Sequence, residues 1–206
     1  MPYLDVLPLF SSPVVNTCVD IDAKSVLEKL KSLPFDKTAH TLVADDGTDT
    51  GISESISILD YFPELKKEIE DKLDYYIREV LSYKTVNYVI TSSWSTQTYP
   101  GGVGQGHIHS NSWLSGVYYP HQCSALQFTK VVRPFLQIEN PEDWNIWNSL
   151  QWDIEPVENT LLIFDSQQNH RVSRNTTDEL RYSIAFNVMP VGKIGYSDST
   201  LYINAK

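Results

Sequence analysis

From about residue 83 to the end, the chain is a succession of short strand-like segments with no helical stretch between them. The segments are rich in Val, Ile, Thr and aromatic residues, and clusters of Gly, Pro and Asn separate them. The predicted strands cover residues 85–98, 113–119, 125–132, 160–165 and 182–189. Strands that follow one another in this way indicate an antiparallel sandwich or barrel, not a parallel sheet with alternating helices.

The preceding residues have a different pattern. The first twenty residues predict an extended arm, and residues 36–56 predict loops or weak strands. Apolar residues recur at helical spacing over residues 21–33 and, more clearly, over 63–81, where Pro63 suits the first turn. We therefore predict one α+β, mainly β domain over residues 1–206. It has an N-terminal arm and helices over residues 1–82, packed on one sheet of a β core formed by residues 83–206.

Composition narrows the classes of partner. The net charge of −10 disfavours binding to nucleic acid or to anionic membranes, and no apolar run is long enough to span a bilayer. Only Cys18 and Cys123 are present, which favours two buried thiols in a reducing compartment over a disulfide framework. With no visible signal peptide, we expect a soluble cytoplasmic protein. For a phage-encoded chain this would be the host cytoplasm, and a homodimer is left open.

Three histidines are candidate metal ligands. His107 and His109 are two residues apart, so both rings project from the same face if this segment is a strand. His170 follows the apolar segment 161–164, whose end is expected to carry it toward the same site. An H-x-H pair alone is equally consistent with hydrogen-bonded surface histidines.

Arg181 is a candidate anion-binding residue. It opens the apolar segment Arg181-Tyr182-Ser183-Ile184-Ala185-Phe186, where a guanidinium needs an anionic partner such as a carboxylate. Ser183 lies two residues further on, on the same face. The alternative is a structural salt bridge with one of the 26 acidic residues.

Taken together, these motifs resemble the 2-oxoglutarate (2OG)/Fe(II) oxygenases, in particular the prolyl-hydroxylase branch. Still more similar is a group of 2OG-Fe(II) oxygenases from marine bacteria and their phages. The resemblance rests on Tyr99-Pro100-Gly101-Gly102, on the run from His107 to Tyr119 with Gly116-Val117-Tyr118-Tyr119, on Leu161 to Val172, and on Arg181 to Asn187. It covers roughly residues 85–190.

The resemblance implies a double-stranded β-helix, that is, a jelly-roll or cupin-like fold, and a dioxygenase that uses Fe(II), 2OG and O2, most simply as a hydroxylase. His170 matches the distal iron ligand. Arg181, helped by Ser183, matches the residue that pairs with the far carboxylate of 2OG. Tyr119, with Tyr99 as a second candidate, matches tyrosines that bind the same carboxylate.

The chain departs from the usual His-x-Asp/Glu…His triad, because no carboxylate stands two residues after either histidine. In one register the metal ligands are His107, His109 and His170. In the other, His109 is the first ligand and Asn111 takes the carboxylate position, with Asp165 or water as substitutes. The sequence favours the three-histidine set, and Asp165 is expected to cap a turn.

Two other functions compete with this interpretation. One is a three-histidine cupin-type metal enzyme that does not use 2OG, and the other is a non-catalytic jelly-roll binding module. The substrate is left open among peptidyl proline, a free amino acid and a small metabolite, so a small-molecule or peptide partner is expected. Trp94, Trp113, His121 and the tryptophan-rich residues 140–152 are candidates for shaping its pocket.

Overall fold

The computed structural model describes residues 4–36, 50–131 and 141–205. Its larger sheet has eight strands in the order β1-β8-β5-β10-β4-β3-β2, with β11 paired to β10. These strands are β1 (Val15–Cys18), β2 (Phe35–Asp36), β3 (Thr50–Ser53), β4 (Asn87–Thr98), β5 (Leu114–Tyr119), β8 (Thr160–Asp165), β10 (Arg181–Ile194) and β11 (Leu201–Ile203). Each pairing within the sheet is antiparallel. The mainly β architecture predicted from the strand pattern is thereby confirmed.

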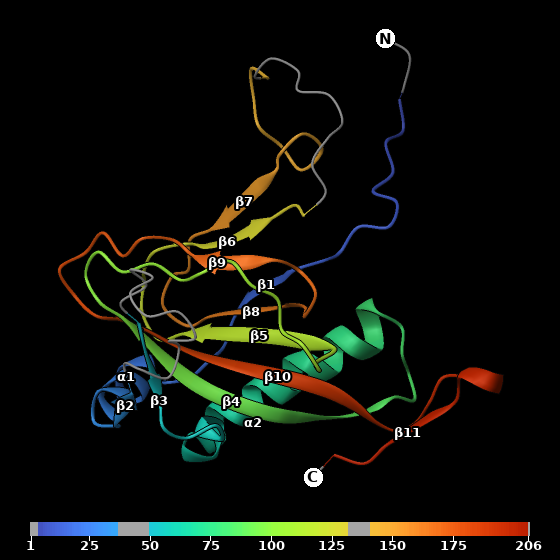
Figure 1. The fold of residues 1–206 in the computed structure, drawn as a ribbon, viewed down its shortest axis with the longest axis horizontal. Coiled ribbons are helices and arrows are strands. Elements are labelled where there is room, and N and C mark those ends of the chain that lie inside the picture. The colour runs from blue at the N-terminus through green and yellow to red at the C-terminus, as the bar shows by residue number, and fades with distance from the viewer. Residues whose placement is uncertain (1–3, 37–49, 132–140, 206) are drawn as a thin grey trace.

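A smaller sheet has three strands in the order β7-β6-β9, and it lies beside the larger one in Figure 1. Its strands are β6 (Leu126–Thr129), β7 (Gln151–Ile154) and β9 (His170–Val172). A single antiparallel bridge joins His107 to His170 at the β9 edge. The segment around His107 thus belongs to the smaller sheet without forming a regular strand, which differs from the strand expected for the H-x-H pair.

The helices cover one face of the larger sheet. They are α1 (Ala23–Lys31), the 3-10 turn η1 (Ile58–Tyr61), α2 (Pro63–Tyr75) and the π-helical turn η2 (Tyr76–Val80) that continues α2. A further 3-10 turn, η3 (Ser197–Ser199), is exposed between β10 and β11 and contributes nothing to this face. Leu65, Ile69 and Leu73 of α2 are each 1% exposed or less and belong to one core with Ile184 and Phe186 of β10. Figure 1 shows α2 running across the β4–β10 part of the sheet. Both helix predictions, and the packing of the helices on one sheet, are confirmed.

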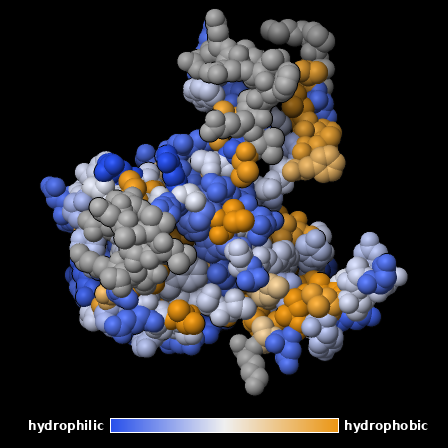
Figure 2. All heavy atoms as spheres, viewed as in Figure 1, coloured by the Kyte–Doolittle hydropathy of each residue, from blue (hydrophilic) through white to orange (hydrophobic). Residues whose placement is uncertain are grey.

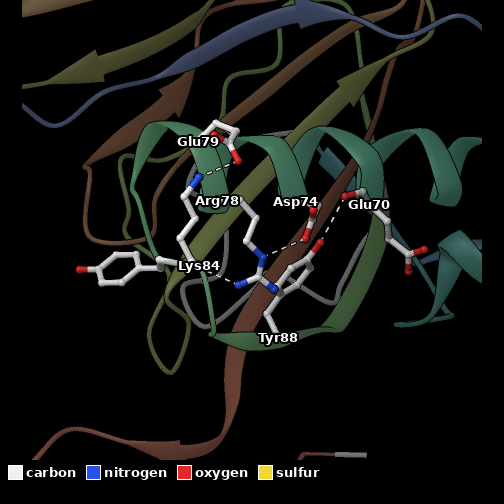
Figure 3. Close-up of polar contacts among 7 residues, drawn as sticks. Glu70, Asp74, Arg78, Glu79, Lys84 and Tyr88 are labelled. Carbon is white, nitrogen blue, oxygen red and sulfur yellow. Dashed lines mark hydrogen bonds and ion pairs between the residues drawn. The ribbon is translucent and has the colours of Figure 1, made fainter.

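Polar contacts fix the end of α2 to the beginning of β4 (Figure 3). Arg78 donates from Nε to Asp74 Oδ1 at 3.2 Å and from Nη1 to the Tyr83 carbonyl at 2.7 Å. The Tyr88 hydroxyl of β4 donates to the Glu70 carbonyl at 3.2 Å, and burial raises the pKa of Tyr88 to about 12. The long strand β4 therefore starts from a fixed point on the helix.

A second core cluster lies between the two sheets. It joins Val117 and Tyr119 of β5 and Leu162 and Phe164 of β8 to Leu126 and Phe128 of β6. Because side chains alternate along a strand, one face of β5 and β8 packs on the helices while the other faces the smaller sheet. The second face borders the cavity described below.

Gly116 of β5 occupies a position where a side chain does not fit. A Cβ atom built there would meet the ring of Phe186, which is fully buried, and would lie 2.8 Å from the Leu162 carbonyl oxygen. We expect Gly116→Ala to destabilise the fold by about 1–3 kcal/mol, as overpacking of a core does. A thermal melt should show a fall in Tm of roughly 2–4 °C per kcal/mol. Gly106→Ala is the control, since its Cβ would have only Asn169 Oδ1 near it, at 3.5 Å. Equal melting of both variants would contradict the packing described here.

The N-terminal arm is extended, as predicted, and its last residues form β1 at the edge of the larger sheet. Before β1, Val14 is half-buried against the second core cluster, but the earlier apolar side chains are exposed: Leu4 by 82%, Leu9 by 71% and Phe10 by 100%. Figure 2 shows these apolar groups as orange spheres along the arm at the upper right. Cys18 is exposed and Cys123 partly buried, so the prediction of two buried thiols is wrong for Cys18, because it lies on an edge strand. Among the described helices, none has the length and apolarity that a membrane span requires.

Candidate active site

A cavity of about 590 Å³ opens between the two sheets. One wall is the inner face of β10, where Arg181, Ser183, Ala185 and Asn187 alternate with buried core residues. The neighbouring strand β4 adds three lining residues. Thr98 pairs with Arg181, Thr96 with Ser183, and Trp94 with Ala185. Residues two apart in a strand are about 7 Å apart. The β10 row therefore spans the cavity from Arg181 at one end to Asn187 at the other.

Three histidines meet at the Asn187 end of this row. One ring nitrogen of each of His107, His109 and His170 lies within 4.8 Å of the others. The approach of His170 depends on the backbone, because His107 N donates to the His170 carbonyl at 2.9 Å and His170 N donates to the His107 carbonyl at 3.0 Å. The sequence predicted that the end of the strand over residues 161–164 would carry His170, and this is wrong. His170 follows a turn and begins β9 on the opposite sheet.

In each imidazole the Nδ1 atom has an oxygen atom as its hydrogen-bond partner. His107 Nδ1 lies 2.9 Å from the Gln105 carbonyl, His170 Nδ1 2.9 Å from the Gln168 carbonyl, and His109 Nδ1 2.7 Å from Asn187 Oδ1. A carbonyl oxygen can only accept, so each Nδ1 carries the proton and each Nε2 presents a lone pair. His107 Nε2 and His109 Nε2 are 3.2 Å apart, a repulsive contact between two lone pairs unless a cation lies beside them. This donor set fits a metal ion.

Burial keeps two of the rings neutral. It lowers the pKa of His109, opposed by the hydrogen bond to Asn187, and it lowers the pKa of His170 to about 3. The hydrogen bond to Gln168 opposes the shift of His170, and the neighbouring His107 and His109 add to it. Because a metal ligand must be deprotonated, these shifts favour metal binding down to acidic pH.

The low pKa of His170 predicts a pH dependence of the metal-free protein. The unfolded chain takes up a proton near the model value of 6.5, whereas the folded chain resists protonation down to about 3. This contribution to stability is thus present above pH 6.5 and is lost as the pH falls toward 3. At pH 5 the loss from His170 is on the order of 2 kcal/mol. Melts in chelator from pH 7.5 to 5 should show a smaller fall in Tm for His170→Gln than for the wild type. Identical pH profiles would contradict the shift.

Arg181 lies at the other end of the row with no ion pair among the described residues. It is 1% exposed, and Nε, Nη1 and Nη2 have no hydrogen-bond partner in the described part of the chain. The hydroxyl of Tyr119 is likewise buried without a hydrogen-bond partner among the described residues, and the guanidinium carbon of Arg181 is 5.0 Å from the centroid of the Tyr119 ring. Burial raises the pKa of Tyr119 to about 12, an effect that Arg181 opposes. A buried cation without a partner is costly, and a carboxylate at this position would satisfy its donors bidentately.

Three residues named from the sequence lie elsewhere. Asn111 is exposed in a turn with φ of 56° and does not line the cavity. Asp165 is exposed and accepts a hydrogen bond from Gln167 N at 2.8 Å, which is the turn-capping role expected of it. The Tyr99 hydroxyl accepts from Gln97 Nε2 at 3.1 Å and is not among the described residues that line the cavity.

Asn187 and Trp94 line the cavity, whereas Trp113 and His121 do not belong to its described lining. Asn187, which was not singled out as a site residue, supports His109 and also accepts from Ser115 Oγ at 2.8 Å. Its spacing from Arg181 places it on the inner face of β10, and this parity could have identified it. Of the candidates for shaping a pocket, Trp94 lines the cavity, whereas Trp113 packs on Tyr83 with ring centroids 5.7 Å apart. His121 lies outside the described lining and accepts from Tyr182 N at 3.1 Å.

Residues 92–187 match a protein family described as "Putative 2OG-Fe(II) oxygenase". Over this segment, a little under half of its length, the chain is similar in sequence to the 2OG-Fe(II) oxygenases. The match spans all three histidines, Arg181 and Asn187, and it decides between the three functions that the sequence left open. The predicted enzyme class, a 2OG/Fe(II)-dependent dioxygenase with Fe(II), 2OG and O2 as cofactors and cosubstrates, is confirmed. No curated protein sequence matches the chain.

Solved structures similar to this chain agree on the fold. The non-heme alpha ketoglutarate dependent epimerase SnoN from nogalamycin biosynthesis has a TM-score of 0.63 at 10% identity, covering 88% of this chain and 77% of SnoN. HygX from Streptomyces hygroscopicus with nickel and 2-oxoglutarate bound has a TM-score of 0.55 at 11% identity, covering 87% and 83%. A Pseudomonas putida prolyl-4-hydroxylase has a TM-score of 0.55 at 15% identity, covering 89% and 96%. The predicted double-stranded β-helix is confirmed.

Proposed function

We propose that His107, His109 and His170 hold Fe(II) and that Arg181, with Ser183 and Tyr119, binds the far carboxylate of 2OG. The observation that carries this proposal is the buried guanidinium of Arg181, which has no partner among the described residues and lines the same cavity as the three Nε2 atoms. A dicarboxylate can satisfy Arg181 with one end and reach the histidines with the other. An enzyme that does not use 2OG has no need of a buried cation there.

The residues of the chain have separate tasks in this proposal. Bound Fe(II) and 2OG supply the chemistry, which is the coupling of 2OG decarboxylation by O2 to the hydroxylation of a substrate C–H bond. Asn187 and the Gln105 and Gln168 carbonyls fix the imidazole tautomers and orientations. The hydroxyl of Ser183, 2.7 Å from Thr96 Oγ1, is oriented beside Arg181. Phe164 packs edge-on against His170, with ring centroids 4.8 Å apart, and excludes water from that side.

The three-histidine ligand set replaces the carboxylate of the usual facial triad with a neutral ring. The described residues include no Asp or Glu within the ligand cluster. Fe(II) bound here would keep one more positive charge than in a triad with a carboxylate. We infer weaker retention of Fe(II) in metal-chelating buffers than in a triad that includes a carboxylate.

The substrate and the setting of the reaction are also part of the proposal. HygX has been solved with hygromycin B bound, and another similar structure is a prolyl-4-hydroxylase, which supports a small molecule or a peptidyl proline as substrate. The two free cysteines support a cytoplasmic location. The apolar side chains that the N-terminal arm exposes support self-association into the homodimer left open by the sequence.

The test is 2OG turnover without added substrate. Iron-loaded protein with 2OG, ascorbate and O2 should form succinate slowly, and Mn(II)-loaded or oxygen-free samples should form none. Anaerobic co-crystallisation with Mn(II) and 2OG would then reveal the ligands directly. Failure to form succinate, together with failure to bind 2OG by calorimetry, would overturn the proposal.

A further inference from the structure

The cavity is larger than the cosubstrate requires. 2OG has roughly ten non-hydrogen atoms, which would fill roughly 300 Å³ at the ~30 Å³ that a water molecule occupies in the liquid. The cavity volume is about 590 Å³, so a comparable space is left over. The lining residues away from the Arg181 end therefore determine which substrate fits in the cavity beside 2OG.

Trp94 is the largest side chain in that remaining space. It stands on the inner face of β4, and the residue paired with it on β10 is Ala185, whose methyl group leaves room above the strand. The indole stacks on the imidazole of His109, with ring centroids 5.6 Å apart and planes inclined by 27°. Trp94 is only partly buried, so part of the ring remains accessible beside the histidine cluster.

Two exposed isoleucines extend this apolar surface. Ile56 is 68% exposed, and its carbonyl accepts from Ser93 N at 2.8 Å, which fixes it next to Trp94 on β4. Ile108 is 43% exposed and lies between the two histidines of the H-x-H pair. Both residues line the cavity. An exposed apolar surface at the mouth of a pocket favours an apolar ligand face.

The charge of the lining restricts the ligand further. Apart from the histidines, the only ionisable cation or anion at neutral pH among the described lining residues is Arg181, which the proposed function assigns to 2OG. Outside the proposed metal and 2OG sites, the polar side chains of the lining are hydroxyls and an amide, namely Thr50, Thr96, Thr98, Ser110 and Gln105. A zwitterion would need a carboxylate and a second cation, whereas an uncharged group needs neither.

We propose that Trp94 is the platform on which an uncharged ring of the substrate docks beside the metal site, an inference that rests on the proposed function. The face of an indole carries partial negative charge and attracts the C–H bonds of a ring laid against it. Because the indole borders the imidazole of His109, with ring centroids 5.6 Å apart, a ring held on its accessible part would lie close to the metal-binding nitrogens. Trp94 thereby selects the kind of substrate and positions the bond that reacts.

The test uses Mn(II)-loaded, oxygen-free protein with 2OG and ligand-observed NMR. The neutral ring probes are N-acetylproline methylamide and methyl β-glucoside. Free proline has the same ring as the first probe but is a zwitterion, and N-acetylalanine methylamide is neutral but has no ring. Trp94→Ala removes the platform and Trp94→Phe keeps a smaller one, in case the alanine variant does not fold. Trp113→Phe is the control, since Trp113 lies outside the described cavity lining.

We expect at least one neutral ring probe to bind saturably to the wild type and to Trp113→Phe. Trp94→Ala should weaken that binding about tenfold or more, which corresponds to about 1.4 kcal/mol, and Trp94→Phe should weaken it less. Free proline and the ring-less probe should bind more weakly than the neutral ring. The inference is overturned if neither neutral ring binds, if free proline binds as tightly, or if both Trp94 variants bind the ring like the wild type. Calorimetry of 2OG alone tests the proposed function separately, so a failure of the ring test with intact 2OG binding concerns Trp94 only.

Discussion

Replacing Arg181 with alanine is expected to abolish 2OG binding at concentrations that saturate the wild type, while Mn(II) binding stays nearly intact. The guanidinium is 1% exposed at the opposite end of the β10 inner face from Asn187, so it can reach the cosubstrate without touching the metal ligands. Leaving a buried carboxylate without its partner costs on the order of 3–5 kcal/mol. At 1.4 kcal/mol per tenfold change, the dissociation constant for 2OG should rise by about 10²-fold or more.

The measurement is a calorimetric titration of 2OG into Mn(II)-loaded, oxygen-free protein. Arg181→Lys should recover only part of the affinity, because an ammonium group cannot reproduce the bidentate geometry of the guanidinium. Equal affinity of the wild type and both variants would remove the main support for the assigned role.

Arg181→Met separates this role from a structural one. In a structural salt bridge, loss of the arginine would cost on the order of 3–5 kcal/mol and lower Tm by roughly 6–20 °C. Here the guanidinium nitrogens have no partner among the described residues. We therefore expect the metal-free Arg181→Met protein to melt at the same temperature as the wild type or higher. A large fall in Tm would identify Arg181 as a structural residue.

Replacing His107 with alanine is expected to weaken binding of Mn(II) or Fe(II) by more than 10²-fold. Loss of a residue that merely orients a ligand typically costs 10–100-fold in metal affinity, and loss of a ligand should exceed this. His107 is the decisive position, because its Nε2 lies 3.2 Å from His109 Nε2 and belongs to the three-histidine cluster. Metal content after dialysis and a competition titration with a chelator measure the effect.

Asn111→Ala is the matched control, because Asn111 is the metal ligand that the alternative sequence register predicts in place of His107. Its exposed turn position, with φ of 56°, lies outside the cavity lining. Metal affinity should be unchanged in this variant. Loss of metal from Asn111→Ala with retention in His107→Ala would reverse the assignment of the ligand set.

The sequence by itself determined the elements and the chemistry of this protein. Strand-forming residues after position 83 and the apolar stripe on residues 63–81 depend on local periodicity, so β4, β5, β8 and α2 could be predicted with bounds close to those observed. The start of β10 was also predicted, but the strand continues to Ile194, five residues beyond the predicted end. The pairing of an H-x-H motif with an arginine that opens an apolar strand likewise follows from residue type and spacing. These signals are local, and together they resemble the motifs of the 2OG-Fe(II) oxygenases.

Only the tertiary structure decided which groups meet and in what state. His170 reaches His107 through backbone pairing between two sheets, and such long-range pairing has no signature in the intervening sequence. The same pairing favours His107 over Asn111, which turns away on a left-handed backbone. Burial also removes water from Arg181 and His170. The guanidinium of Arg181 therefore lacks a hydrogen-bond partner among the described residues, and the imidazole of His170 stays neutral, as a metal ligand must.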